Sequence, residues 1–212
     1  DLNNFMIYPN WTPYKMFSEP PSILYSQWMP DQKLVVYAGT LGLKHRPKLL
    51  IALADDTEFK KLNGVVVVVS QGLGRKFLDQ PENRRENLKL MDFLEISELS
   101  GLFHQASVLL AVLEPEASEF SVPSKIMSYL TVGKPIVASI SSENASAIIL
   151  TETGAGIVVS PTSSDKSFAD AVVTILTNAG LSSRMGDAGF RFAAENFDGS
   201  KAAQFFLYQI YK

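Results

Sequence analysis

The chain carries LVVYAGTLG at residues 34–42 and VVVVVSQGLG at residues 65–74. Each stretch is a short apolar run with almost no polar alternation, followed at once by a glycine-containing turn. Runs of this kind are typical of parallel strands that are buried on both faces of a sheet. Four more runs of the same type follow: LKLMDF (88–93), SVLLAVL (107–113), PIVASI (135–140) and AGIVVS (155–160).

Segments with helical spacing separate these runs. They lie at residues 46–56, 75–80, 97–106, 123–132 and 143–153. Strands that alternate with helices predict an α/β protein, built as a Rossmann-like doubly wound parallel sheet of about six strands flanked by helices. Three more helical stretches follow the last strand, at residues 165–178, 181–196 and 200–211.

The composition excludes several classes of protein. Of the 212 residues, 46% are hydrophobic and 19% are charged, which permits a sizeable core and excludes bulk disorder. The net charge of −3, without a long basic block, argues against a nucleic-acid binder that neutralises phosphates. The longest aliphatic run, residues 65–69, is far shorter than the ~20 residues that a membrane-spanning helix needs.

Side chains that bind metals or act as nucleophiles are scarce. There is no cysteine, which excludes disulfides, thiolate metal sites and a cysteine nucleophile. His45 and His104 are far apart in the sequence, so a histidine-rich metal site is not expected. We therefore predict no metal site, and we interpret His104, which lies inside a predicted helix, as structural.

The two ends of the chain differ from its centre. Residues 1–32 are rich in aromatic residues, Pro and Asn, and they predict an irregular lead-in before an α/β domain at residues 33–196. The chain begins without an initiator Met or an apolar signal core, so either an upstream piece was removed or the chain starts inside a longer protein. This favours the cytoplasm, and the glycosylation-like triplets at Asn10 and Asn144 are interpreted as chance.

Two glycine turns are candidates for phosphate binding, because ligands of open parallel sheets bind beyond the carboxyl ends of the strands. The glycines of residues 39–42 let backbone N–H groups approach a phosphate at a helix N-terminus. This turn lacks the full dinucleotide-binding fingerprint, and a plain tight turn is the alternative. Residues 71–76 add Arg75 and Lys76, cations that can offset charge on a phosphate leaving group or simply begin a solvated helix.

A polar stretch, EPEASEFSVPSK at residues 114–125, lies between an apolar run and a helical segment. Its carboxylates, hydroxyls and lysine can hydrogen-bond the hydroxyls of a sugar or ribose, and an acidic surface loop is the alternative. Gly133-Lys134-Pro135 is not a phosphate-binding P-loop, because position 128 is Ser and Pro follows the Lys. We predict instead that Gly133 ends a helix and that Pro135 opens a strand.

Taken together, several stretches resemble the C-terminal half of retaining GT-B glycosyltransferases, in the large group often called group 1 or family 4. They are YPNW (8–11), VVYAGTLGLKH (35–45), VVVVVSQGLGRKFL (65–78), ELSGLFHQASVLLAVL (98–113), FSVPSKIMSYLTVGKPIVAS (120–139), TGAGIVVSP (153–161) and SSRMGDAGFRFAAENF (182–197). The VPSK…Y…GKP stretch is similar to members that build bacterial surface polysaccharides. The resemblance rests on the order and spacing of the stretches and covers nearly the whole chain.

Such enzymes have two Rossmann-like domains, so the resemblance implies that this chain is half an enzyme. Residues 33–196 would bind a UDP- or GDP-linked sugar, and residues 197–212 would form a helix that crosses back to a missing N-terminal acceptor domain. The implied reaction transfers the sugar to an acceptor hydroxyl with retention, without a metal or other cofactor. It belongs to polysaccharide or glycan biosynthesis in the cytoplasm, with the full-length protein at the inner face of the cytoplasmic membrane. No nucleic-acid partner is expected, and no membrane span in this chain.

The resemblance also implies roles for individual residues, although it leaves the catalytic residue unassigned. The donor diphosphate would be bound by Gly39, Thr40, Leu41, Gly42, Arg75 and Lys76. The base would meet Phe93 and Leu94, and the donor sugar and ribose would meet Glu119, Ser121, Ser124, Lys125 and Ser128. If the last helix docks on the missing half, exposed aromatic residues are expected here: Phe205, Phe206, Tyr208 and Tyr211.

Two positions depart from the family pattern. Many relatives carry two glutamates separated by seven residues, and Ser128 stands where the second would bind ribose; Thr40 stands where many have Arg. Loss of a charge-assisted bond to ribose costs about 1–3 kcal/mol, or roughly ten- to a hundredfold in donor affinity. A second hypothesis is therefore a degenerate, non-catalytic nucleotide-binding or assembly module of the same fold. A third is a related GT-B epimerase, whose additional carboxylates and histidine have no obvious counterpart in this half.

Overall fold

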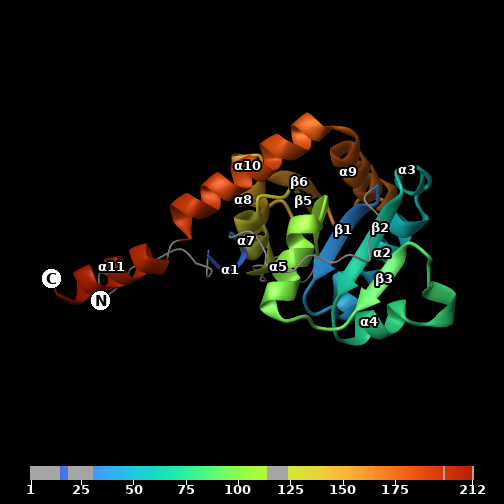
Figure 1. Cartoon of the computed structure of the whole chain (residues 1–212), viewed down its shortest axis with the longest axis horizontal. Helices are drawn as coiled ribbons and strands as arrows, with labels where there is room; N and C mark the ends of the chain where they lie inside the picture. Colours follow the sequence, from blue (N-terminus) through green and yellow to red (C-terminus); the bar gives the residue numbers. More distant parts are fainter. Residues whose placement is uncertain (1–14, 19–30, 114–123, 198, 212) are drawn as a thin grey trace.

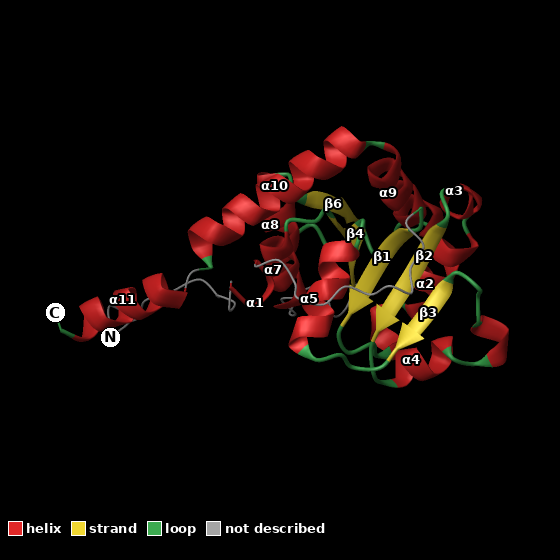
Figure 2. Ribbon diagram, in the orientation of Figure 1, coloured by secondary structure: helices red, strands yellow, loops and turns green. Residues whose placement is uncertain are grey.

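The structure, a computed structural model, describes residues 15–18, 31–113, 124–197 and 199–211 (Figure 1). Its centre is a sheet of six parallel strands in the order β3-β2-β1-β4-β5-β6 (Figure 2). The strands are β1 (Lys33–Ala38), β2 (Gly64–Val69), β3 (Leu88–Met91), β4 (Val108–Val112), β5 (Ile136–Ser139) and β6 (Gly156–Val159). Each of the six predicted runs is a strand of this sheet, and the predicted fold class is confirmed.

The central strands are buried because helices cover both faces of the sheet. Strands β2, β4 and β5 are buried along their whole length, and in β1 only Lys33 is exposed. This explains their near-continuous aliphatic sequences. The predicted runs extend past some strands because the chain turns away at their ends. Ser70, for example, follows β2 and donates a hydrogen bond from its hydroxyl to the Gly39 carbonyl oxygen (2.7 Å).

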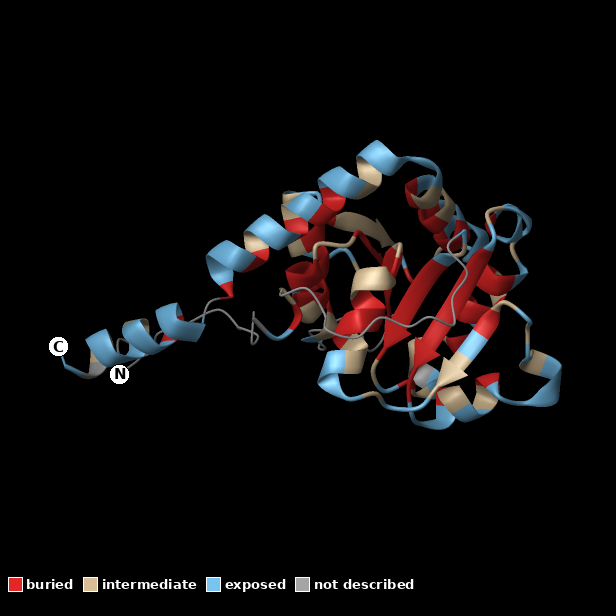
Figure 3. Cartoon of the chain, in the orientation of Figure 1, coloured by how far each residue is buried: buried red, intermediate tan, exposed pale blue. Residues whose placement is uncertain are grey.

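Helices form a layer on each face of the sheet (Figure 3). One layer contains α5 (Ile96–Gln105), α7 (Ser124–Val132), α8 (Ala145–Thr153) and α10 (Ala179–Asn196). The other contains α2 (Pro47–Asp55), α3 (Thr57–Lys61) and α9 (Asp165–Thr177), with α4 (Leu73–Leu78) against α2. Each face has its own hydrophobic cluster, because alternate residues of a strand point to opposite faces: Val36 belongs to the α7 side and Tyr37 to the α2 side.

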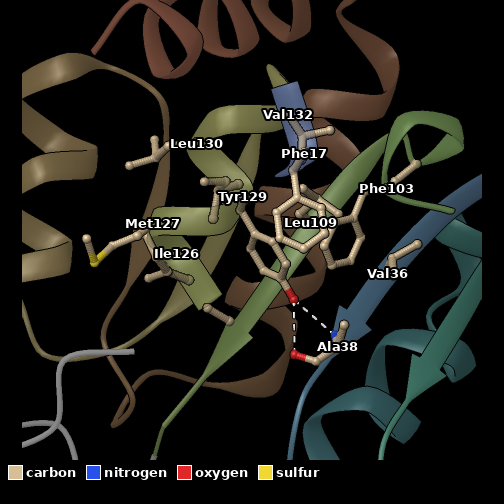
Figure 4. Packing of buried hydrophobic residues seen from close by; sticks show 14 of the residues in the cluster. Phe17, Val36, Ala38, Phe103, Leu109, Ile126, Met127, Tyr129, Leu130 and Val132 are labelled. Carbon is tan, nitrogen blue, oxygen red and sulfur yellow. Dashed lines mark hydrogen bonds between the residues drawn. The ribbon is translucent and has the colours of Figure 1, made fainter. Parts of the chain in front are cut away.

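A short helix interrupts the predicted irregular lead-in. Residues 15–18 form one helical turn, α1 (Lys15–Ser18), which was not predicted from the sequence. Its Phe17 is buried against Phe103 of α5, with ring centroids 5.4 Å apart (Figure 4). Helix α3 was also not predicted; Asp56 caps it by accepting a hydrogen bond from the N–H of Phe59 (3.0 Å). The triplet at Asn10 lies outside the described residues.

Helix α10 lies close to the end of α7, and a glycine of α10 makes this approach possible. Gly133 follows α7 in a left-handed conformation (φ 73°), which confirms that it ends this helix. A Cβ at position 186, in the middle of α10, would lie 2.2 Å from the carbonyl oxygen of Gly133. Only glycine at position 186 permits this approach.

The last helix, α11 (Gly199–Ile210), extends beyond the body of the domain (Figure 1). The exposure expected of the C-terminal aromatic residues is confirmed for Phe206 (44%) and Tyr208 (63%) of α11 and for Tyr211 (85%), which follows it. Phe205 is half-buried, and its ring packs edge-on against Phe206 with centroids 5.6 Å apart. Within the described part of the chain, no helix is both long enough and apolar enough to cross a membrane.

Candidate functional site

The strand order reverses between β1 and β4, and these two strands separate at their carboxyl ends. They pair as far as Tyr37 and Leu110, whereas β4 stays paired with β5 as far as Val112. The helix that follows β1 covers one face of the sheet, and α7, which comes after β4, covers the other. Ligands of doubly wound folds bind in the crevice that such a reversal creates.

The two predicted glycine turns lie against each other beside this crevice. The N–H of Leu41 donates to the carbonyl oxygen of Gln71 (2.9 Å), and the N–H of Gly74 donates to that of Leu41 (2.8 Å). Gly72 has a φ of 105°, and a Cβ there would lie 2.8 Å from the Leu41 carbonyl oxygen. The turns therefore form one hydrogen-bonded unit at the ends of β1 and β2.

Most N–H groups of the first turn are already used within the fold. The N–H of Gly39 donates to the carbonyl oxygen at the end of β2 (3.0 Å), and the N–H of Leu41 donates to Gln71 as described above. The N–H of Gly42 donates to Nδ1 of His45 (2.8 Å). The Leu41 side chain is fully buried. The N–H of Thr40 makes no hydrogen bond within the described residues, and Thr40 is exposed. Thr40 is therefore the residue of this turn whose amide is available to an anion.

Lys125, in the first turn of α7, extends its ammonium toward this glycine turn. Its Nζ lies 3.7 Å from the centroid of the Tyr37 ring, and a Cβ at Gly39 would be 3.3 Å from it. The Nζ is buried and has no hydrogen-bond partner among the described residues. Burial lowers the pKa of Lys125 to about 7. A buried ammonium that lacks an anionic partner is unfavourable by itself and is characteristic of binding sites.

Two tyrosines beside Lys125 were not predicted from the sequence. Tyr37 lies beneath the ammonium, and Tyr129 contacts the end of β1 from α7 (Figure 4). A signal was available for Tyr129, because residues four apart in a helix lie on the same face and Tyr129 is four residues after Lys125. Burial raises the pKa of both tyrosines, so their hydroxyls remain protonated.

The two cations predicted for the diphosphate differ in their surroundings. Arg75 pairs with Asp92 (3.1 Å) and Asp79 (3.7 Å), whereas Lys76 is exposed. The guanidinium of Arg75 thus links α4 to the residue after β3, and its charge is offset there. Lys125, rather than Arg75, is the buried cation whose charge is left unpaired by the described residues.

The residues predicted for the base and the sugar lie at several places along the edge of the sheet. Phe93, next to Asp92, is 53% exposed, and Leu94 packs against the core on the α7 side. On α7, Ser124 is exposed and Ser128 is partly buried. Two of the predicted residues, Glu119 and Ser121, lie outside the described residues.

Two polar residues that lie away from the crevice, His104 and Asn144, are partly and fully buried, respectively. The imidazole Nδ1 of His104 is buried, and burial together with the charge of nearby Lys134 lowers its pKa. Asn144 is buried and caps α8 by accepting from the N–H of Ser146 (2.9 Å), which agrees with interpreting its triplet as chance. The described residues contain no group of three or more His, Asp or Glu side chains that could hold a metal ion.

The sequence was also compared with models of known protein families and with curated proteins. The family model described as glycosyl transferases group 1 matches residues 32–178. No curated protein sequence matches the chain.

Several solved structures share the fold. WaaG, a glycosyltransferase involved in lipopolysaccharide biosynthesis, is 21% identical with a TM-score of 0.66, over 84% of this chain and 47% of WaaG. Sucrose-phosphate synthase from Thermosynechococcus elongatus is 17% identical with a TM-score of 0.72, over 96% of this chain and 51% of the synthase. Anabaena Alr3699/HepE in complex with UDP-glucose is 20% identical with a TM-score of 0.67, over 85% and 49%. The chain therefore spans about half the length of these three proteins.

Proposed function

Since the chain belongs to the group 1 glycosyltransferases, we propose that it is the donor-binding half of a retaining glycosyltransferase. The enzyme transfers a sugar from a nucleotide diphosphate sugar to an acceptor hydroxyl in polysaccharide or glycan biosynthesis. The length of the similar structures, about twice that of this chain, supports the assignment to one half. In this proposal residues 33–196 bind the donor, and residues 197–212 cross back to an N-terminal acceptor domain.

One observation carries the proposal: the buried ammonium of Lys125, which no described residue pairs, lies beside the Gly39–Thr40 turn. It lies at the carboxyl ends of β1 and β4, where ligands of this fold class bind. A donor diphosphate supplies the anion that the described residues do not give the ammonium, and the N–H of Thr40, which is not bonded by these residues either, adds a second donor. The exposed ring of Phe93, at the end of β3, is available to the base.

The same groups support the chemistry of transfer. The bond between the anomeric carbon of the sugar and the diphosphate oxygen breaks, and its electron pair stays with the diphosphate. The acceptor oxygen forms the new bond to that carbon, and its proton passes to the leaving diphosphate. The ammonium of Lys125 and the N–H of Thr40 stabilise the charge that develops on the leaving diphosphate. The proposal assigns this role to no metal ion and to no other cofactor.

Calorimetric titration with nucleotides tests the proposal directly. HepE has been solved in complex with UDP and with UDP-glucose, so UDP is the first nucleotide to use and GDP is the comparison. We expect saturable binding of one nucleotide at one site per chain. The proposal would be contradicted if neither UDP nor GDP bound to this chain and neither bound to the full-length protein.

A second candidate is a non-catalytic nucleotide-binding or assembly module of the same fold. It is favoured by Ser128, an uncharged residue one turn after Lys125 on α7, at the position where many members of the family carry a ribose-binding glutamate. Incubation of the full-length protein with nucleotide sugars separates the two candidates. Hydrolysis or transfer of a sugar excludes the second candidate, whereas binding without any turnover supports it.

The affinity for UDP is expected to fall as the pH rises from about 7 to about 9. Because the pKa of Lys125 is lowered to about 7, the empty site is cationic below that pH and neutral above it. A diphosphate binds the cationic form, so the loss approaches ~10-fold per pH unit, while the terminal phosphate of UDP, with a pKa near ~6, stays ionised. Lys125→Arg keeps its charge throughout this range and should abolish the fall. An equal fall in that variant would refute the assignment to Lys125.

A further inference from the structure

Among the described residues, the end of β1 has no strand partner on the β4 side, and a tyrosine hydroxyl bonds its backbone instead. Pairing of β1 with β4 stops at Tyr37, yet the next residue, Ala38, still directs its N–H and carbonyl into the gap. The Tyr129 hydroxyl accepts from the Ala38 N–H (3.0 Å) and donates to the Ala38 carbonyl oxygen (3.3 Å) (Figure 4). One side chain of α7 thus bonds both backbone groups of Ala38. Buried backbone N–H and carbonyl groups need such partners.

The ring of Tyr129 is held in place by aromatic neighbours. The ring is fully buried and packs edge-on against Phe103, with centroids 5.2 Å apart. Phe103 in turn contacts Phe17 of α1 (5.4 Å). The Tyr129 hydroxyl therefore has a fixed position, and through it the first turns of α7 are fixed relative to β1.

A second tyrosine acts from the opposite face of the sheet. Tyr37 belongs to the hydrophobic cluster on the α2 side, whereas Tyr129 belongs to the cluster on the α7 side. The Tyr37 ring supports the ammonium of Lys125 at 3.7 Å, and its hydroxyl donates to the Thr40 carbonyl oxygen (2.9 Å). One side chain thus connects the ammonium to the turn that contains the N–H of Thr40.

We propose that Tyr129 and Tyr37 are positioning residues that hold the Lys125 ammonium and the Gly39–Thr40 turn at the spacing that a donor diphosphate requires. The proposal rests on the proposed function for its ligand. Neither tyrosine touches the donor: Tyr129 acts by fixing α7 to the end of β1, and Tyr37 acts by supporting the ammonium and bonding Thr40. Separation of the strands allows this, because Lys125 of α7 reaches the ring of Tyr37, a residue of the other cluster, where β1 and β4 have parted.

The first test needs no nucleotide. In Tyr129→Phe the ring remains against Phe103, but both backbone groups of Ala38 lose their partner. NMR titration of the lysine Cε and Nζ signals is expected to show the titration midpoint of Lys125 rising by at least ~0.5–1 pH unit, because a released α7 lets the ammonium reach water. Tyr208→Phe, the same change at an exposed tyrosine, is the control and should leave the midpoint unchanged. An unmoved midpoint in folded Tyr129→Phe overturns the proposal.

The second test measures UDP affinity in a double-mutant cycle. Tyr129→Phe is expected to weaken UDP binding by about 3- to 10-fold in the natural chain and to have no further effect in the Lys125→Met background. An equal loss in both backgrounds overturns the proposal, because it shows an effect on the fold that does not pass through Lys125. Tyr37→Phe, which keeps the ring under the ammonium and loses only the bond to Thr40, should also weaken binding and provides a second variant if Tyr129→Phe is unstable.

The two tests also separate failure of this proposal from failure of the proposed function. If the natural chain and the full-length protein bind neither UDP nor GDP, the proposed function fails, and the diphosphate part of this proposal fails with it. The NMR titration then still decides whether the tyrosines position Lys125. If UDP binds and the midpoint of Lys125 does not move in Tyr129→Phe, only the positioning role fails.

Discussion

Replacement of Lys125 by Met is expected to weaken UDP binding by about 10- to 100-fold and at the same time to stabilise the chain by about 1–2 kcal/mol. The two effects have one cause. The ammonium is buried without a partner among the described residues, so it is unfavourable in the empty fold and becomes favourable when a diphosphate neutralises it. Met keeps most of the length of the side chain and removes the charge. Calorimetry with UDP and chemical denaturation of the two proteins measure the two effects.

The stabilising effect expected of Lys125→Met should depend on pH in a defined direction. The pKa of Lys125 is about 7 in the folded chain and near ~10.4 in an unfolded one, so between these values the unfolded chain binds more protons. The free energy of unfolding of the natural chain should therefore rise with pH across this interval relative to Lys125→Met. The stabilising effect of the substitution is thus largest below about pH 7 and fades toward about pH 10.

A matched control is available in Lys61, an exposed lysine on α3 that pairs with Glu58 (2.8 Å). Lys61→Met removes the same charge from the surface and should change UDP affinity by less than about twofold and stability by less than ~0.5 kcal/mol. Equal losses of affinity in both variants would mean that net charge, and not the position of Lys125, attracts the nucleotide. A less stable Lys125→Met variant would contradict the description of this lysine as an unpaired cation.

The second large effect is expected at the contact between α10 and the end of α7. Gly186→Ala should lower the free energy of unfolding by about 2–4 kcal/mol, because the new Cβ would lie 2.2 Å from the Gly133 carbonyl oxygen and 3.0 Å from its carbon. Both atoms belong to the backbone, so the overlap is relieved only if α10 moves away. Denaturant unfolding measures the loss.

The control for this substitution lies in the same helix. Gly180 is exposed near the start of α10, and a Cβ there would meet its nearest atoms at an ordinary distance of 3.5 Å. Gly180→Ala should therefore be neutral or stabilise the chain by up to ~1 kcal/mol, since alanine favours helix more than glycine does. If both substitutions have the same effect, helix propensity alone governs α10 and its close contact with Gly133 has no energetic importance.

The family of the chain and the position of its site follow from different observations. Membership in the group 1 glycosyltransferases follows from the match over residues 32–178. The position of the candidate diphosphate site follows from the structure, in which the ammonium of Lys125 lies against the Gly39–Thr40 turn at the end of β1. Because Lys125 is the buried cation of this candidate site, it serves as the main test of the proposed function.

Local patterns were sufficient for the six strands, for the main helices and for the alternation of the two. Buried parallel strands need continuous apolar runs, glycine marks the turns after them, and both features can be identified within a window of ten residues. The short helices α1 and α3 could not be predicted in this way, because one turn of helix has too few residues to show a period. Phe17 is an example, since its burial depends on contact with Phe103, far away in the sequence.

What the sequence determined by itself is therefore the fold class and the list of polar residues that follow each strand, Lys125 among them. Only the tertiary structure decided which of these already have partners among the described residues. It showed that Leu41 and Gly42 have already used their N–H groups, that Arg75 is neutralised by Asp92, and that Lys125 is not paired by any described residue. The physical reason is that Gln71 and Asp92, the partners of Leu41 and Arg75, belong to segments that follow neighbouring strands, so they come within reach only when the sheet has formed.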